Sequence, residues 1–180
     1  MLEVRCLDAF PEWLRTLADD ARGLATLLES GGDGVAERRA AAALNYLFKS
    51  LDLIPDGLED LGFIDDAFVV RAAAQAVAHE AADAVQADAT GTLSRLASDA
   101  DLIHEFLGDE YGRLTRYVAG LEHGSARGRS VDAVVNDAAV RADFVREVGE
   151  WADGYAVPAF ARDARNLVKL RAFLLAKLPA

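Results

Sequence analysis

Apolar residues recur at three- and four-residue steps along most of this chain, and that spacing places them on one face of an α-helix. The first such stretch predicts a helix over residues 11–29, with Pro11 in its first turn and Asp8 as its cap. Its apolar face consists of Leu14, Leu17, Ala21, Leu24 and Leu28. A glycine-rich segment at residues 30–34 then ends the helix.

A helical hairpin is predicted next. Its first helix is expected over residues 35–49, and its second, rich in alanine, over residues 63–88. Pro55 cannot continue a helix, so the chain must turn just before it. Asp56 and Glu59 fit a reciprocal capping pattern that predicts a short turn of helix ending at Gly62. Because alanine leaves little side chain between neighbours, the second helix can lie in the centre of a bundle.

The rest of the chain predicts three more helices. One is expected over residues 92–122 with a bend near Gly108 or Gly112, and one over residues 130–153 with Ser130 as its cap. The last is expected from Pro158 to just before Pro179. No run alternates with a period of two for long enough to predict a strand. The fold class is therefore all-α: a single domain over residues 1–180, a bundle of about six helices around the central hairpin.

Composition and charge narrow the function. The formal net charge is −11, whereas a nucleic-acid-binding protein normally carries a basic face, so binding to DNA or RNA is not expected. The same charge disfavours peripheral contact with an anionic membrane. Cys6 is the only cysteine, which rules out an intramolecular disulfide and suits a reducing cytoplasm. We expect no signal peptide and no apolar stretch of about 18 residues that could span a bilayer.

One motif resembles a known family. Its residues are Asp52, Leu53, Ile54, Pro55 and Asp56, followed by Gly62, Asp65 and Asp66. The order resembles the bacterial YkvA-like family, a domain of unknown function with an Asp-Leu-Ile-Pro-Asp turn, a Leu-Gly pair and an Asp-Asp pair. The resemblance covers residues 36–75 and implies a helical hairpin but no established activity. Ser50 and Leu51 depart from the pattern because relatives often have a proline there, and residues 57–60 are more polar than in relatives.

The acidic hairpin is the leading candidate for chemistry. If its carboxylates converge, they could bind a hard divalent cation such as Ca²⁺ or Mg²⁺. The candidate ligands are Asp52, Asp56, Asp65 and Asp66. Alternatively, these residues cap helix ends and pair with Arg38, Arg39 or Lys49. Their spacing does not match the loop in which Ca²⁺ ligands alternate and end in glutamate, which favours the structural alternative.

Catalytic patterns are weaker. Asp101 and His104 have the three-residue spacing of half a di-iron site, but the sequence has no second such pair. His79 and His123 are expected to be surface or hydrogen-bonded residues. Cys6 lies near an N-terminus that we expect to fray, with no histidine close in sequence. We therefore predict no catalytic residue and no cofactor.

The last predicted helix is basic, although the chain as a whole is acidic. Arg162, Arg165 and Lys169 lie in this segment with one acid, Asp163. We expect the helix to dock near the acidic hairpin of the same chain or of a second copy. The leading functional hypothesis is a non-catalytic helical module that binds a protein partner or self-associates. Binding of a divalent metal or small ligand at the hairpin, and an undetected hydrolase, are the alternatives.

Overall fold

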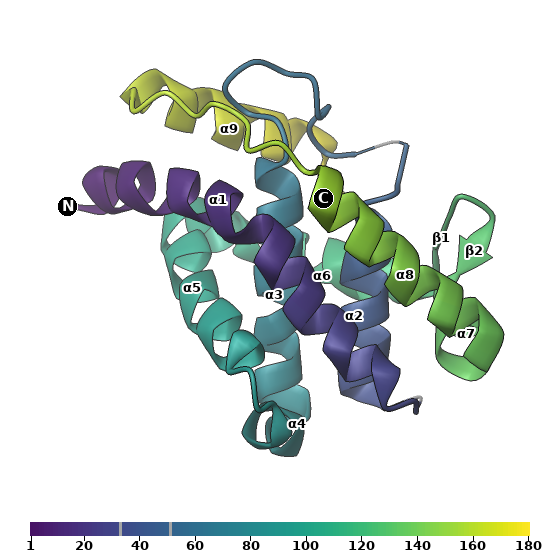
Figure 1. Cartoon of the computed structure of the whole chain (residues 1–180). Coiled ribbons are helices and arrows are strands. Elements are labelled where there is room, and N and C mark those ends of the chain that lie inside the picture. The colour runs from purple at the N-terminus through teal and green to yellow at the C-terminus, as the bar shows by residue number, and fades with distance from the viewer. Residues whose placement is uncertain (33, 51) are drawn as a thin grey trace.

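The computed structural model describes residues 1–32, 34–50 and 52–180, and it confirms the all-α class (Figure 1). Its larger helices are α1 (Leu2–Glu29), α2 (Val35–Tyr46), α3 (Ile64–Glu80), α5 (Thr92–Leu107), α8 (Ala138–Gly154) and α9 (Ala164–Lys177). The shorter elements are α4 (Ala82–Ala87), η1 (Gly108–Glu110), α6 (Tyr111–Gly120), η2 (Leu121–His123), β1 (Ser125–Ala126), β2 (Arg129–Ser130) and α7 (Val131–Asn136). In the described residues, no helix is both long enough and apolar enough to cross a membrane.

Helix α3 lies at the centre of the bundle. It packs against α1, α2, α5 and α6, while α8 lies along α1 on the outside (Figure 1). Every residue from Ile64 to Ala74 is buried, so this part of α3 contacts protein on all sides. Small side chains allow such close packing because they let neighbouring backbones approach. The expectation that the alanine-rich helix occupies the middle of the bundle is therefore correct.

Helix α1 begins earlier than predicted. It starts at Leu2, with Pro11 inside it, because Cys6 and Phe10 continue the buried face and are fully buried. Pro11 removes one backbone hydrogen bond, but burying a side chain such as that of Phe10 contributes about 1.5–3 kcal/mol and offsets the loss. Asp8 does not cap this helix; its carboxylate pairs with Arg162. The expectation that the segment around Cys6 frays is wrong.

Three predicted helices are divided in the structure. The third breaks at Ala81 between α3 and α4, and the fourth breaks at Gly108, whose φ of +60° suits glycine. The fifth breaks at Asp137, whose carboxylate accepts hydrogen bonds from the first turn of α8. Ser130 caps α7 as predicted, through a hydrogen bond from the backbone N–H of Ala133.

Three other predicted boundaries are wrong. Helix α2 ends at Tyr46 rather than at residue 49, and residues 56–63 form turns instead of a short helix. Asp56 therefore opens no helix, and the residue preceding α3 is Phe63 in a left-handed conformation. Helix α9 begins at Ala164 rather than near Pro158, because the carboxylate of Asp163 accepts a hydrogen bond from the backbone N–H of Arg165.

A small β-hairpin lies where the fourth predicted helix gives way to the fifth. Ser125 pairs with Ser130 and Ala126 with Arg129 in antiparallel register. The two residues between the strands, Arg127 and Gly128, both have positive φ, as the tight turns of two-residue hairpins require. Strands of two residues are too short to show alternation, which explains why the pattern gave no sign of them.

A buried ion pair crosses the bundle centre. Arg71 of α3 and Asp20 of α1 both have fully buried side chains, and Arg71 Nη2 donates to Asp20 Oδ2 at 3.3 Å. Arg71 Nε donates to Asp99 of α5 at 3.1 Å, and Arg95 also pairs with Asp20. The guanidinium carbon of Arg71 lies 4.4 Å from the centre of the Trp13 ring. This network joins α1, α3 and α5 with charges that compensate one another inside the core.

Replacing Arg71 by methionine should lower the free energy of unfolding by about 3 kcal/mol, because the substitution leaves the buried carboxylate of Asp20 with less compensation. Urea denaturation followed by circular dichroism measures the change. The matched control is Arg15→Met, which removes an exposed pair with Glu12 and should cost less than about 1 kcal/mol. Equal losses in the two variants would contradict the structural role of the Arg71 network.

Candidate functional site: a buried carboxylate cluster

The motif residues meet at the end of α2 and the start of α3. The Tyr46 hydroxyl donates to Asp65 Oδ2 at 2.5 Å and accepts the backbone N–H of Leu53 at 2.8 Å. The same oxygen of Asp65 accepts the backbone N–H of Ile54 at 3.1 Å. These bonds hold the turn before Pro55 against both helices. They also satisfy buried backbone donors that would otherwise cost about 1–3 kcal/mol each.

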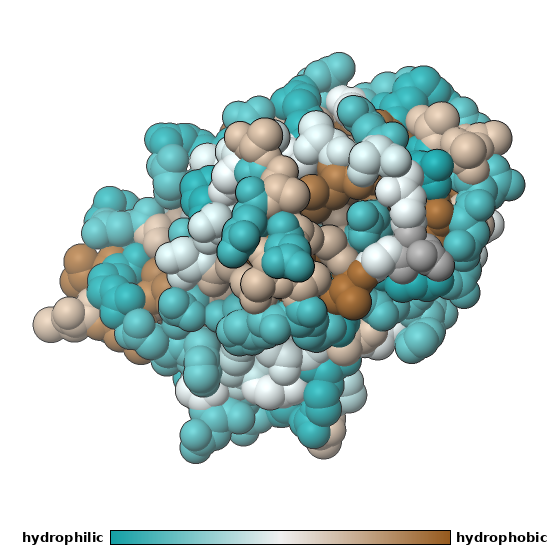
Figure 2. Space-filling view, turned by 90° about the horizontal axis from the view of Figure 1, so that it is seen from below, coloured by the Kyte–Doolittle hydropathy of each residue, from teal (hydrophilic) through white to brown (hydrophobic). Residues whose placement is uncertain are grey.

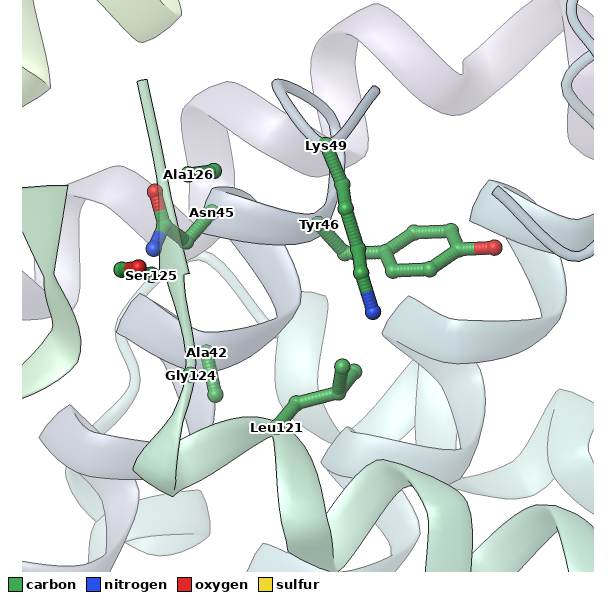
Figure 3. Close-up of a pocket in the computed structure, with 8 residues that line it drawn as sticks. All are labelled: Ala42, Asn45, Tyr46, Lys49, Leu121, Gly124, Ser125 and Ala126. Carbon is green, nitrogen blue, oxygen red and sulfur yellow. The ribbon is translucent and has the colours of Figure 1, made fainter. Parts of the chain in front are cut away.

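Figure 3 shows the other side of the end of α2. The Tyr46 ring extends away from Asn45 and Ser125, while Asn45 faces the small β-hairpin. Asn45 Nδ2 donates to the carbonyl of Arg129 at 3.1 Å. The pocket between these residues has a volume of about 40 Å³, and a cavity needs about 10–15 Å³ by this measure to hold one water molecule. It is too small to hold an organic ligand, and the hydrogen bond of Asn45 joins the end of α2 to the β-hairpin.

A glycine in the motif allows the turn to close. A Cβ atom added to Gly62 would lie 2.1 Å from the carbonyl oxygen of Asp56, far inside contact distance. Because that neighbour is backbone rather than a flexible side chain, a substitution at residue 62 would force the turn apart. At Gly57, in the same turn, an added Cβ would meet nothing within 4 Å. Gly62 is therefore in the motif for a steric reason.

Four aspartates surround this turn, and several of their oxygens have no hydrogen-bond partner. Asp65 is fully buried and Asp66 is 2 % exposed. Within the described part of the chain, Asp65 Oδ1, Asp66 Oδ2 and Asp52 Oδ1 are buried without a donor. A buried carboxylate oxygen without a donor or cation is costly, so the cluster has an unmet capacity for positive charge or protons.

Burial and mutual repulsion change how these groups ionise. Burial, followed by the charges of Asp56 and Asp65, raises the pKa of Asp52 to about 7. Burial raises the pKa of Asp65 to about 6, although the hydrogen bonds from Tyr46 and Ile54 act in the opposite direction. The pKa of Asp66 is raised well above its ordinary value by burial and then by the charge of Asp65. These four carboxylates therefore lie close enough to oppose one another's charge.

The three cations expected to pair with these aspartates have other partners, and two of them lie at the far end of α2. Arg39 pairs with Glu80 and Glu122, and Arg38 pairs with Asp132. Lys49 donates to the Tyr117 hydroxyl at 3.1 Å, although its charge also lowers the pKa of Asp52. Within residues 1–32, 34–50 and 52–180, no three His, Cys, Asp or Glu side chains are arranged to hold a metal ion. Metal binding by these aspartates therefore stays a prediction.

The other candidates for chemistry lie elsewhere. His104 stacks on Tyr111, with ring centres 4.7 Å apart, and Asp101 accepts a hydrogen bond from Gln75 at 3.0 Å. Both line a cavity of about 440 Å³ that His79 also borders. His123 ends η2. Burial raises the pKa of the Cys6 thiol to about 11, so it stays protonated at neutral pH and is a poor nucleophile.

The basic residues of the last segment have partners away from the hairpin. Arg162 pairs with Asp8 of α1, and Arg165 pairs with Asp163 at 2.6 Å. The hydrogen bond from Arg165 and then the charge of Lys169 help to hold the pKa of Asp163 at about 2. Helix α9 packs against α1. These contacts differ from the predicted docking of Arg162 and Arg165 on the hairpin of the same chain; docking on a second copy stays a prediction.

The raised pKa values of Asp52 and Asp65 predict that the protein is more stable at mildly acidic pH. A carboxyl whose pKa is higher in the folded chain than in the unfolded chain stabilises the fold while protonated. That stability is lost as the pH rises from about 4 to 7. We expect the Tm in EDTA to rise by a few degrees between pH 7.5 and pH 5.5, since about 1 kcal/mol shifts Tm by about 2–4 °C at this length.

Thermal denaturation at the two pH values, followed by circular dichroism, measures this dependence. Asp52→Asn should raise the Tm at pH 7.5 and flatten the pH dependence, because the amide carries no charge. Asp83→Asn is the matched control, since Asp83 is exposed on α4. A pH dependence that is equal in the parent and both variants would contradict the role of Asp52.

Comparison with known proteins finds a family match for the hairpin segment, and that family has no assigned activity. Residues 39–71 match a family described as a protein of unknown function (DUF1232). The match begins in α2, includes the turn and the aspartates, and ends within α3. It covers less than a fifth of the chain. Comparisons with curated proteins and with solved structures give no match.

Proposed function

We propose that this chain is a non-catalytic helical module that binds another protein. The observation that carries this proposal is an apolar groove between the start of α1 and α9, away from the residues matched by the family. The groove encloses about 450 Å³. Its lining residues are Leu2, Glu3, Cys6, Phe106, Ala164, Arg165, Leu167, Val168 and Arg171. We infer that the segment matching DUF1232 also belongs to the YkvA-like family, which it resembles. We further infer that this segment forms the rigid centre of the module.

The groove lies where the protein exposes large apolar side chains. Val168 of α9 is 71 % exposed and Leu2 of α1 is 36 % exposed, and both line the groove. Val4 of α1, Phe173 of α9 and Met1, the residue before α1, are also exposed. Figure 2 shows hydrophobic residues at the left end of the molecule, the end at which α1 begins in Figure 1. Exposed apolar residues grouped around a concave surface are typical of sites that bind proteins or ligands.

The groove also has a firm base. Cys6 is fully buried, Phe106 and Leu167 are each 7 % exposed, and Phe106 packs edge-to-face on Phe10. Arg171 donates from Nη1 to the Phe106 carbonyl at 2.7 Å, which fixes α9 against the end of α5. A surface with a packed base and an exposed apolar edge can accept the side chains of a partner without rearranging, which reduces the entropic cost of binding.

Replacing Val168 by glutamate should remove binding at the groove without affecting the fold, because the side chain is exposed and its removal empties no core space. The probe is an amphipathic helical peptide with leucine at every third or fourth position and glutamine elsewhere. Methyl NMR measures its binding through shifts at Leu2, Leu167 and Val168 in the parent chain. In Val168→Glu we expect the shifts at Leu2 and Leu167 to be lost, with affinity reduced by about tenfold or more.

The matched control is Val157→Glu, since Val157 is also exposed, at 51 %, but does not line the groove. This variant should bind the peptide as the parent does. If the peptide shifts no groove methyl in the parent, or binds equally to both variants, the proposed function at this groove is wrong.

A second candidate function is divalent-cation binding at the aspartates of the motif. It is favoured by the buried oxygens of Asp52, Asp65 and Asp66 that lack donors. Carboxylate oxygens are the ligands that Mg²⁺ and Ca²⁺ prefer. The side chains would have to move toward a common point, because in the described residues they are not arranged around one.

Addition of Mg²⁺, Ca²⁺ or Mn²⁺ at pH 7.5 tests this candidate. Binding at a hundred times the dissociation constant adds about 2.7 kcal/mol, which corresponds to a rise in Tm of about 5–10 °C. The rise should be smaller in Asp52→Asn and unchanged in Asp83→Asn. If no metal changes the Tm of the parent chain, cation binding at this cluster is ruled out.

A further inference from the structure

Helix α9 differs in charge from the rest of the chain. Between Ala164 and Lys177 it contains four basic residues and no acidic residue, whereas the chain as a whole has a formal net charge of −11. The basic residues are Arg165, Lys169, Arg171 and Lys177. The helix that forms one wall of the groove is therefore a local region of positive charge in an acidic protein.

The basic side chains border the apolar part of the groove. Arg165 and Arg171 lie three residues before and after Val168, so all three are on one face of α9. Arg165 and Arg171 both line the groove with Val168. Lys169 lies next to Val168 in sequence and one helical turn after Arg165. On the α9 wall the exposed apolar centre is therefore flanked by cations, whereas the α1 wall contributes one acid, Glu3.

These cations differ in how far they are already neutralised. The guanidinium of Arg171 donates to the carbonyls of Phe106 and Leu107 at the end of α5, an arrangement that fixes the charge without pairing it to a carboxylate. Arg165 forms an ion pair with the carboxylate of Asp163, so its charge is partly neutralised. Among the ion pairs and hydrogen bonds of the described residues, Lys169 takes part in none. Arg171 and Lys169 thus offer positive charge to a bound partner.

We propose that the groove between α1 and α9 binds an acidic amphipathic helix of a partner protein. This proposal rests on the proposed function and names the chemistry of the partner. The apolar face of such a helix enters the groove beside Val168, and its carboxylates meet Arg171, Lys169 and Arg165. An amphipathic helix in an apolar groove is a common mode of recognition, and complementary charge at the edge favours one partner over others.

Two other occupants fit less well. An anionic membrane would be repelled by the net charge of −11, and a membrane-binding helix presents its apolar residues on an outward face rather than in a groove. A second copy that docks groove to groove would place two basic α9 helices together, because a two-fold interface brings the same patch from both subunits into contact. The charge of α9 therefore favours an acidic partner of another sequence.

The experiment compares three peptides of about 16 residues that share one leucine face and carry glutamate, glutamine or lysine on the other face. Fluorescence anisotropy measures their binding to the whole chain at about 0.05 M and 0.5 M salt. We expect the glutamate peptide to bind about tenfold more tightly than the glutamine peptide at low salt, and the lysine peptide to bind most weakly. The difference should shrink at high salt because exposed charges are screened.

A charge reversal assigns the effect to the groove. Lys169→Glu should weaken binding of the glutamate peptide by about tenfold and leave the glutamine peptide unchanged. Lys177→Glu is the matched control, since Lys177 is exposed at the far end of α9, six residues beyond the last lining residue, whereas Lys169 lies next to Val168. It should change neither affinity.

The outcomes separate the two proposals. If none of the peptides binds, the groove is not a binding surface and the proposed function fails with this inference. If all three bind equally at both salt concentrations, the groove binds helices without regard to charge and only this inference is wrong. Binding to vesicles of phosphatidylglycerol, or a dimer in sedimentation that Lys169→Glu abolishes, would also overturn it.

Discussion

The architecture around the motif depends on one carboxylate oxygen. Asp65 Oδ2 receives the Tyr46 hydroxyl from the end of α2 and the backbone N–H of Ile54 from the turn, while Asp65 itself lies in the first turn of α3. Three segments therefore meet at one acceptor that is fully buried. A charged acceptor makes shorter and stronger hydrogen bonds than a neutral one, which suits a junction that must keep its shape. The sharp change of direction after α2 follows from it.

Unlike Asp65, the remaining aspartates of the motif do not hold the turn together. Asp66 and Asp52 keep buried oxygens without donors, and burial, followed by the charges of neighbouring aspartates, raises the pKa of both. Such an arrangement reduces stability at neutral pH, so it is not explained by the needs of the turn alone. Residues held at a cost to stability are often retained for function. The exposed apolar groove at α1 and α9 is a second region that stability does not require.

Much of this could be predicted from the sequence because it is local. The helical class, the central alanine-rich helix, the turn at Pro55 and the cap at Ser130 all follow from spacing and from residue types next to one another. The breaks at Ala81 and Asp137 were not predicted, since helical periodicity continues across them. The Tyr46 hydroxyl could not be assigned to Asp65, because the path of the backbone through the turn decides where it points. The groove was not predicted either. Its walls, α1 and α9, come from opposite ends of the chain, and no local sequence pattern shows that they meet.

The buried guanidinium of Arg71 makes the hairpin depend on helices outside it. Arg71 is the last residue of the segment that matches the family, but its carboxylate partners, Asp20 and Asp99, belong to helices on either side of that segment. A segment with an arginine at this position cannot be transplanted alone, because it would carry an uncompensated charge into any new core. It must arrive with helices that supply the acids, or with a replacement for the arginine. The stability of the hairpin therefore depends on its flanking helices, although the family match covers only residues 39–71.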